Sequence, residues 1–371
     1  FQWILVDEYQ DINPAQYHFL LNLAAEKAPN LIVIGDPDQA IYGFRRASAR
    51  FIRRFQKDFP PACVYPLTQS FRCSNTILSA SCDVISSTSK GRMEGCDEGV
   101  RITLTSHRTD KSEAEFVART IEDMIGGLRF FSMDSEVSAG YSTGETQSLS
   151  DFAVLARTHD LLVPLEKAFA DHSIPCQVVT SLPFAQQQPS RSVIELLKLT
   201  LYPQLARLQK QPPPENLPRS ENRSSKSLLH DIIKKFFPVQ ENECEPLMNL
   251  ASRFPSPEEF LRNITLGSGV EGYDSTVERA VLMTLHAAKG LEFPCVFIIG
   301  CSDKLLPYNL FPSQKSDEKE EERLLYVGMT RAQKYLFLSH AEKRHIHGRN
   351  MAFLPSPFID RIKSDWLQRK H

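Results

Sequence analysis

The amino-acid sequence predicts an α/β fold, because strand-like and helix-like stretches alternate along most of the chain. The short apolar runs "WILVD" (3–7) and "LIVIGD" (31–36) are typical of buried parallel strands. The amphipathic stretch "PAQYHFLLNLAAEKAP" (14–29) lies between them and has the pattern of a helix. Strand, helix and strand at this spacing favour a parallel sheet, whose ligands gather at the carboxyl ends of the strands. Asp7 and Glu8 stand at such an end.

The same alternation continues in the next part of the chain. Helices are predicted from "FRCSNTILSASCDVI" (71–85) and "SEAEFVARTIEDMI" (112–125). Strands are predicted from "VRITLTS" (100–106) and "FAVLAR" (152–157). The polar stretch "SMDSEVSAGYSTGETQSLS" (132–150) is predicted to be a surface loop, because small and polar residues dominate it.

Helical patterns in 190–274 interrupt this order. They are broken by the Pro- and Ser-rich stretch "KQPPPENLPRSENRSSKS" (210–227), which predicts a flexible connection. Strand patterns return with "AVLMTL" (280–285), "CVFIIG" (295–300) and "YLFLS" (335–339). We therefore expect a helical insertion in an α/β domain whose sheet is completed by strands on both sides of it.

Composition limits the class of protein. The 371 residues are 42% hydrophobic and 24% charged, with a formal net charge of -2, as in ordinary globular proteins. A nucleic-acid site would therefore be a local groove rather than a strongly basic surface. The eight cysteines include no C-x-x-C pair, so we expect neither a zinc knuckle nor a disulfide framework, and a reducing, cytoplasmic location. The longest apolar runs fall far short of the ~20 residues of a membrane span, so no membrane partner is expected.

The adjacent carboxylates of Asp7 and Glu8 are the first candidate for chemistry. In a nucleotide hydrolase, an acid at a strand end helps to hold Mg²⁺, and its neighbour positions or deprotonates the attacking water. Asp7 suits the first role and Glu8 the second. The ordinary alternative is a solvated strand end, since Asp-Glu pairs are common there.

The stretch "IGDPDQAIYGFRRA" (34–47) is the second candidate. Gln39 can hydrogen-bond a terminal phosphate or the attacking water. Tyr42 and Phe44, followed by Arg45, suit single-stranded nucleic acid, because every base offers a face for stacking and arginine can bind the backbone. The alternative is that both aromatic rings pack in the core, which composition alone slightly favours.

These two stretches resemble motifs II and III of the UvrD/Rep family of superfamily 1 DNA helicases, whose patterns read like "VDExQDxN" and "GDxxQSIYxFRGA". Three further stretches resemble motifs IV, V and VI in the family's order: "LTQSFRCSNTI" (67–77), "LMTLHAAKGLEFPCVFIIG" (282–300) and "EEERLLYVGMTRAQKYLFL" (320–338). Together they cover about residues 3–340. The resemblance implies a RecA-like P-loop NTPase architecture that uses ATP and Mg²⁺.

The resemblance implies catalytic roles for Asp7, Glu8 and Gln39, with Asp7 as the metal ligand. It also implies that Arg72 and Arg331 reach the γ-phosphate, where a fixed guanidinium neutralises charge in the transition state. The nucleotide-binding residues are then these two arginines, with Phe71 stacking on adenine and Glu292 accepting hydrogen bonds from the ribose: Arg72, Arg331, Phe71 and Glu292.

For DNA, the resemblance places Thr284 and His286 where the family contacts the backbone, beside Tyr42, Phe44 and Arg45. Each residue alone has an ordinary interpretation: arginines are usually surface residues, and His286 could be a loop histidine. Their joint spacing favours the functional interpretation.

Several positions depart from the family pattern. Arg46 stands where motif III usually has glycine, and Ser70-Phe71 replaces the common Asn-Tyr of motif IV. Lys289 lies in motif V, but the sequence predicts no role for it. The phosphate-binding loop G-x-x-x-x-G-K-[ST] occurs nowhere in these residues. Because the chain begins at Phe1 inside a predicted strand, we expect a fragment of a longer protein.

The predicted organisation is a partial first RecA-like domain (1–66) and a second RecA-like domain (67–189 and 275–371) with a helical insertion (190–274). The insertion is shorter than the mobile accessory subdomain of the family.

The predicted function is that of an ATP-dependent 3′–5′ DNA helicase acting on single-stranded DNA and duplex junctions, with repair or replication proteins as further partners. The isolated chain is expected to lack full ATPase activity. One alternative is an inactive module that binds single-stranded DNA or a protein partner. Another is a helicase-nuclease subunit, which the short stretch after motif VI disfavours, because no acidic metal-binding cluster occurs there.

Overall fold

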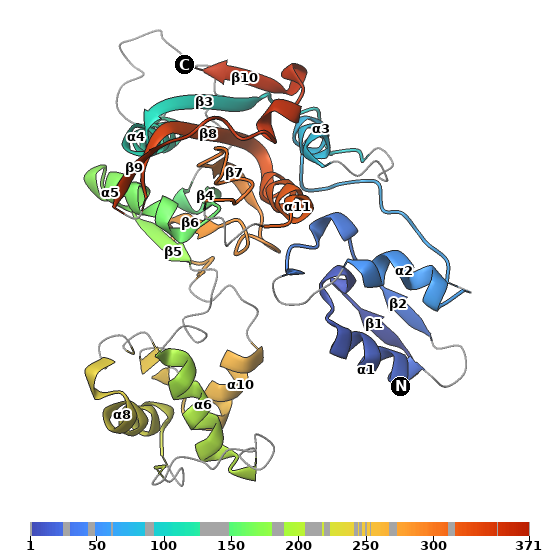
Figure 1. Cartoon of the computed structure of the whole chain (residues 1–371), viewed down its shortest axis with the longest axis vertical. Helices are drawn as coiled ribbons and strands as arrows, with labels where there is room; N and C mark the ends of the chain where they lie inside the picture. The colour runs from blue at the N-terminus through green and yellow to red at the C-terminus, as the bar shows by residue number, and fades with distance from the viewer. Residues whose placement is uncertain are drawn as a thin grey trace. The chain divides into compact units, whose positions relative to one another are not determined.

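The computed structural model describes most of the chain, and Figure 1 shows its elements. The described residues are 2–24, 30–43, 49–60, 62–85, 93–126, 148–179, 189–204, 217–218, 223–240, 244, 247–248, 251–252, 254–266, 273–310, 316–346 and 348–370. The chain folds as two compact units, one formed by Phe1–Val178 and Asp274–His371 and the other by Val179–Tyr273. The predicted domain limits stay predictions.

The first unit begins with a small parallel sheet. Strands β1 (Ile4–Val6) and β2 (Leu31–Val33) pair in parallel, and helix α1 (Pro14–Ala24) connects them. Asn13 and Gln16 exchange side chain-to-backbone hydrogen bonds of 2.9 Å, which cap the start of α1 directly before Pro14. The predicted strand, helix and strand are therefore confirmed, although β2 ends at Val33, and positions 25–29 of the predicted helix lie outside the described residues.

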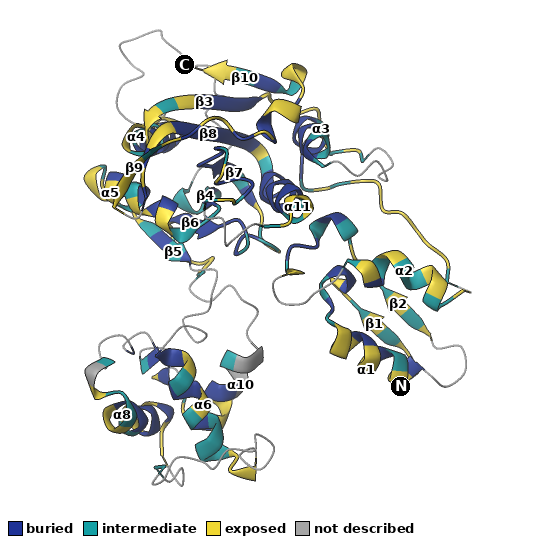
Figure 2. Ribbon diagram, viewed as in Figure 1, coloured by how far each residue is buried: buried dark blue, intermediate teal, exposed yellow. Residues whose placement is uncertain are grey.

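One face of this small sheet is packed and the other is open. The short helices η1 (Tyr9–Asp11) and η2 (Pro37–Gln39) and helix α2 (Arg50–Asp58) follow the strand ends, and Tyr9, Tyr17 and Phe51 form the core. Leu5 and Ile32 lie opposite each other in register, yet they are 68% and 44% exposed. The small sheet thus has an exposed apolar residue in the middle of each strand. Figure 2 colours the ribbon by how far each residue is buried.

The main sheet of this unit has eight strands in the order β10-β3-β8-β7-β4-β6-β5, with β9 paired to β8. The described registers from β10 to β6 are parallel, and β9 is antiparallel to β8. The strands are β3 (Ile102–Thr109), β4 (Phe152–Ala156), β5 (Cys176–Val179), β6 (Ala280–Thr284), β7 (Phe293–Ile298), β8 (Ala332–Ile346), β9 (Arg349–Ala352) and β10 (Leu367–Lys370). The α/β prediction is confirmed, as is a sheet built from strands on both sides of the insertion.

The centre of the main sheet is covered on both faces, as parallel sheets require. Every residue of β4 and β6 is buried. Figure 1 shows helices α4 (Asp110–Gly126) and α5 (Val163–Asp171) toward one side of this sheet and α3 (Asn75–Val84) and α11 (Glu318–Met329) toward the other.

Helix α3 and strand β8 are among the elements whose bounds differ from the sequence prediction. Helix α3 begins only at Asn75, because the preceding Ser74 is in an extended conformation. Strand β8 has 15 residues, and it continues past the predicted apolar run because it pairs with β9 as well as with β3 and β7.

The second unit is helical. Its described helices include α6 (Ser190–Leu201), α8 (Ser225–Phe236) and α10 (Pro257–Leu266). Apolar side chains from these helices form a separate core that includes Val193, Leu228 and Phe260, each 0% exposed. The helical pattern predicted for residues 190–274 is therefore confirmed. Of the predicted flexible stretch 210–227, positions 210–216 and 219–222 lie outside the described residues. Within the described part of the chain, no helix has the length and apolar character of a transmembrane segment.

Candidate nucleotide and nucleic-acid site

The two acids after β1 face outward. Asp7 accepts a hydrogen bond of 2.8 Å from the backbone N–H of Glu8, and both residues are exposed. Glu8 has φ 50° and ψ 40°, a left-handed conformation that is uncommon for a residue with a side chain. Such backbone strain is typical of functional sites. The turn therefore holds two carboxylates together at the end of the strand.

Gln10 ties the two strand ends of the small sheet together. Its side chain is buried; Nε2 donates to Glu8 Oε2 at 2.6 Å, and Oε1 accepts from the backbone N–H of Asp36 at 3.1 Å. Asp36 in turn accepts from Nε2 of Gln39 at 3.2 Å. The sequence reasoning assigned Gln10 no role, although it lies in the same stretch as Asp7 and Glu8.

Arg331 is fixed inside the main-sheet lobe, although its side chain carries a charge. It is 1% exposed, and its guanidinium donates to Val327 O at 2.9 Å, Leu291 O at 3.1 Å and Thr330 Oγ1 at 3.2 Å. Within the described part of the chain, it forms no ion pair with a carboxylate. A buried guanidinium without an acidic partner is costly unless an anion compensates its charge.

The pKa of Arg331 reflects this position. Burial lowers its pKa from 12.5 to about 10, and the positive charge of Arg72 is the next cause. The negative charge of Glu8 acts in the opposite direction. Arg331 therefore stays protonated at neutral pH, and the three residues lie within electrostatic reach of one another.

Arg72 and Glu292 form an ion pair near the surface. Arg72 Nε donates to Glu292 Oε2 at 2.6 Å, and Gln333 Nε2 donates to Glu292 Oε1 at 3.2 Å. The hydrogen bond from Arg72 is the main cause that holds the pKa of Glu292 below its usual value, although desolvation opposes it. Phe71, next to Arg72, is 88% exposed and has its ring free for stacking. The structure thus brings together Arg72 and Glu292, two of the predicted nucleotide residues.

Lys289 links the loop between β6 and β7 to the small-sheet region. Its Nζ forms an ion pair with Asp11, lies 3.5 Å from Glu8 Oε2 and donates to Gln39 O at 2.7 Å. The same ammonium lies 5.1 Å from the centre of the Tyr42 ring, within the range of a cation–π interaction. Sequence reasoning missed this role, because the partners of Lys289 lie about 250 residues and more away along the chain.

The predicted DNA residues are only partly described. Tyr42 donates to the backbone carbonyl of His286 at 3.5 Å, so these two residues are brought together. Thr284 is 3% exposed, and its Oγ1 accepts from the backbone N–H of Ala287 at 3.3 Å. Phe44 and Arg45 lie outside the described residues, so their predicted contacts with DNA stay predictions.

The residues present fit part of a magnesium nucleotide. The exposed carboxylate of Asp7 offers the hard oxygen ligand that Mg²⁺ prefers. Arg331 offers a fixed guanidinium whose charge no described acid neutralises, and Arg72 lies beside it. These groups suit the metal and the terminal phosphate, whereas the glycine-rich loop and lysine that would hold the other phosphates are absent from the sequence.

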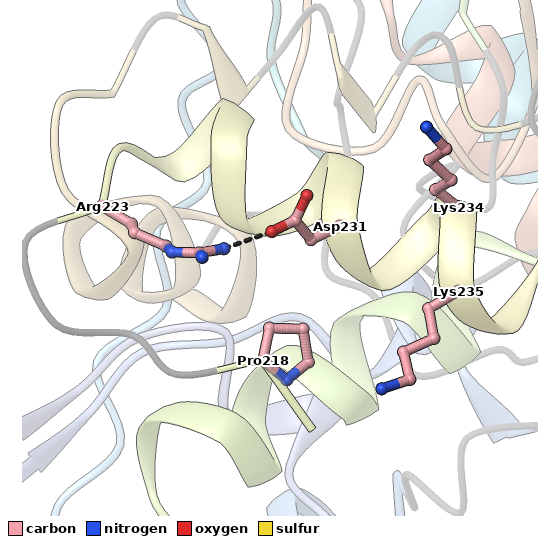
Figure 3. Close-up of a pocket in the computed structure, with 5 residues that line it drawn as sticks. All are labelled: Pro218, Arg223, Asp231, Lys234 and Lys235. Carbon is pink, nitrogen blue, oxygen red and sulfur yellow. Dashed lines mark hydrogen bonds and ion pairs between the residues drawn. The ribbon is translucent and has the colours of Figure 1, made fainter. Parts of the chain in front are cut away.

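The helical unit has a basic hollow of its own (Figure 3). It has a volume of about 320 Å³ and is lined by Pro218, Arg223, Asp231, Lys234 and Lys235. Arg223 and Asp231 form an ion pair across it. No predicted site residue lines this hollow.

Comparison with protein families gives two matches that together span most of the chain. The model described as the UvrD-like helicase C-terminal domain matches residues 65–233 and 240–343. The model described as the UvrD/REP helicase N-terminal domain matches residues 1–60.

Curated relatives include three proteins named ATP-dependent DNA helicase PcrA. The protein of Staphylococcus aureus (strain Mu50) is 28% identical over 449 residues, covering 99% of this chain and 59% of the relative. Those of Leuconostoc citreum and Bacillus subtilis (strain 168) are 29% and 28% identical, covering 99% of this chain and 58% of each relative. The chain therefore spans less than two thirds of these relatives.

Proposed function

Because this chain belongs to the UvrD/Rep family of DNA helicases, we propose that it is the larger part of an ATP-driven motor. In this proposal the whole protein moves 3′ to 5′ along single-stranded DNA and separates duplex at junctions. The burial of Arg331 without a described acidic partner is the observation that supports it most, because such a charge is stabilised when an anion binds.

The nucleotide would bind between the small sheet and the main-sheet lobe. Asp7 would hold Mg²⁺, and Glu8 would position and deprotonate the attacking water, with Gln39 orienting it. Bound Mg²⁺ supplies positive charge at the phosphates. Arg72 and Arg331 would neutralise the charge that develops on the γ-phosphate, while Phe71 stacks on the adenine and Glu292 accepts from the ribose.

The DNA would bind where the two predicted sets of nucleic-acid residues meet. Tyr42 and Phe44 would stack on bases, and Arg45 would bind the backbone. Thr284 and His286 would contact the backbone from the loop after β6. The contacts of Lys289 with Gln39 and Tyr42 support this arrangement, because they connect the nucleotide residues with the DNA residues over a short path.

The 371-residue chain by itself would not turn over ATP, because it contains no G-x-x-x-x-G-K-[ST] loop. The same observation favours one second candidate function, a module that binds single-stranded DNA or a protein partner without hydrolysis. The two candidates differ in the whole protein. The motor has DNA-stimulated ATPase activity, and the module has none.

The test is the substitution Arg331→Ala in the whole protein. Loss of a γ-phosphate arginine is expected to lower DNA-stimulated ATP turnover about 10³-fold or more, because the remaining Arg72 would neutralise only part of the charge that develops there. Arg331→Lys keeps the charge but not the planar fork, and should also be severely impaired. Arg349→Ala, which removes an exposed arginine of β9, is the matched control and should keep full turnover.

Thermal unfolding is measured for each variant, so that a folding defect is separated from a catalytic one. If Arg331→Lys folds normally and turns over ATP like the Arg349→Ala control, the assignment of Arg331 to the γ-phosphate is wrong. If the unsubstituted whole protein binds single-stranded DNA but has no ATPase activity, the binding module is the correct function.

A further inference from the structure

The first half of α11 holds the loop formed by residues 39–43. Glu320 Oε1 accepts from the backbone N–H of Gly43 at 3.0 Å, and Arg323 Nε donates to Ala40 O at 2.7 Å. Residues three apart lie on the same face of a helix, so both side chains reach the loop from one side. Through Tyr42, this loop leads into the predicted DNA-stacking residues.

The contact requires a glycine in the loop. A Cβ atom at position 43 would lie 2.4 Å from Oε2 of Glu320 and 3.1 Å from its Cδ. Since these atoms are the end of a flexible side chain, an added methyl group would displace the carboxylate instead of the backbone. Gly43 is therefore the position where the contact can be broken without changing α11.

The carboxylate of Glu320 is half-buried. Burial is the main cause that raises its pKa above the usual value, while the N–H of Gly43 and the charge of Arg323 oppose this shift. A partly desolvated carboxylate that accepts a backbone hydrogen bond is held in place more firmly than a solvated one.

The other end of the same helix leads into Arg331. Helix α11 ends at Met329, and the guanidinium of Arg331 donates back to Val327 O in its last turn. From Glu320 to Arg331 the rise of a helix gives about 17 Å. Helix α11 therefore contacts the loop of residues 39–43 near its start and leads into Arg331, the predicted γ-phosphate arginine, at its end.

We propose that Glu320 and Arg323 are positioning residues that tie the loop carrying Tyr42 to the helix that leads into Arg331. They touch neither nucleotide nor DNA, but they transmit a displacement of α11 to the loop that binds single-stranded DNA. The inference rests on the proposed function and adds two residues to which that function assigned no role.

The test uses the whole protein and a double-mutant cycle. Glu320→Ala removes the acceptor, and Gly43→Ala displaces it. Each is expected to raise the DNA concentration for half-maximal ATPase stimulation about tenfold, without changing the KM for ATP in the absence of DNA. Glu320→Gln keeps an accepting oxygen and should restore most of the coupling. Lys319→Ala changes an exposed neighbour in α11 and is the matched control.

The double variant Glu320→Ala/Gly43→Ala should be no worse than either single variant, because both changes break the same contact. Two results would overturn the inference: a Glu320→Ala protein that behaves like the Lys319→Ala control, or a double variant in which the two effects add. A merely structural role would lower thermal stability equally in the alanine and glutamine variants.

Binding of a labelled oligothymidylate is measured on the same variants, because this assay needs no ATP turnover. If the unsubstituted protein has no ATPase activity, the proposed function fails, yet about tenfold weaker binding by Glu320→Ala and Gly43→Ala would still support the positioning role. Equal affinities across all variants in that case would overturn it.

Discussion

In the main-sheet lobe Arg331 is 1% exposed and each nitrogen of its guanidinium donates a hydrogen bond, whereas in the small-sheet region Asp7 and Glu8 are exposed at a strained turn. The main sheet is covered on both faces at β4 and β6, but the small sheet leaves Leu5 and Ile32 open. The comparison shows a candidate site with one half preformed by packing and the other half held by few contacts.

Lys289 is one of the described residues that join these two regions directly. It reaches from the loop after β6 to Asp11, Glu8 and Gln39, and only 6% of its side chain is exposed. The small-sheet region thus depends on the main-sheet lobe for the positive charge of Lys289, which its acids Glu8 and Asp11 face. We expect the packing of the main sheet not to depend on the small sheet.

The largest expected effect tests how firmly the preformed half is packed. Glu113 of α4 forms a buried ion pair with Arg344 of β8 and accepts from Ser339 Oγ at 2.7 Å. The substitution Glu113→Ala should lower the free energy of unfolding by about 3–5 kcal/mol, because it leaves a buried guanidinium unpaired. Chemical denaturation measures this, with Asp123→Ala, an exposed acid of the same helix, as the control. An equal, small loss in both variants would remove the contrast between the halves.

The next effect is smaller and tests how Lys289 connects the main-sheet lobe with the small-sheet region. Lys289→Ala removes the ammonium that donates to Asp11 and Gln39. It should loosen β1 and β2 by about 2 kcal/mol, the usual contribution of a hydrogen bond to a charged group, and leave β4 and β7 unchanged. Amide hydrogen exchange of the four strands measures both parts. Lys343→Ala, at an exposed position of β8, should change neither, and faster exchange in β7 after Lys289→Ala would contradict the one-sided dependence.

The smallest effect is expected on the open face. Leu5 is already 68% exposed, so Leu5→Lys should change the free energy of unfolding of this chain by no more than about 0.5 kcal/mol. Val154 of β4 is 0% exposed, so Val154→Lys, which buries a charge and should prevent stable folding, serves as the positive control. Thermal unfolding of the two variants gives the answer. A large loss on Leu5→Lys would mean that this face is covered in solution.

Much of the fold could be predicted from the sequence, because the strands of a covered parallel sheet form continuous apolar runs. The runs at "FAVLA" and "AVLMT" became β4 and β6 for that reason. The ends of the strands were harder to predict. Strand β8 extends to Ile346 through polar residues, since pairing with β9 rather than hydrophobicity keeps it extended.

The candidate site could be located from its motifs but its contacts could not. The motifs predicted roles for Arg72, Glu292 and Arg331, and nothing in the sequence indicated that Arg72 pairs with Glu292 or that Arg331 is held by backbone carbonyls. The hydrogen bonds of Lys289 and Glu320 join segments more than 240 residues apart along the chain. A local sequence pattern carries no information about such distant pairs. Their assignment needed the three-dimensional fold.

Strand β8 begins directly after Arg331 and runs for 15 residues, about 50 Å at the rise of a strand. It lies between β3 and β7, and their hydrogen bonds run across its axis on both sides. A pull on Arg331 along that axis would load these bonds together, in shear, instead of opening them one at a time. The arginine therefore directly precedes a strand that is paired on both sides, and a load applied there would be shared among many hydrogen bonds.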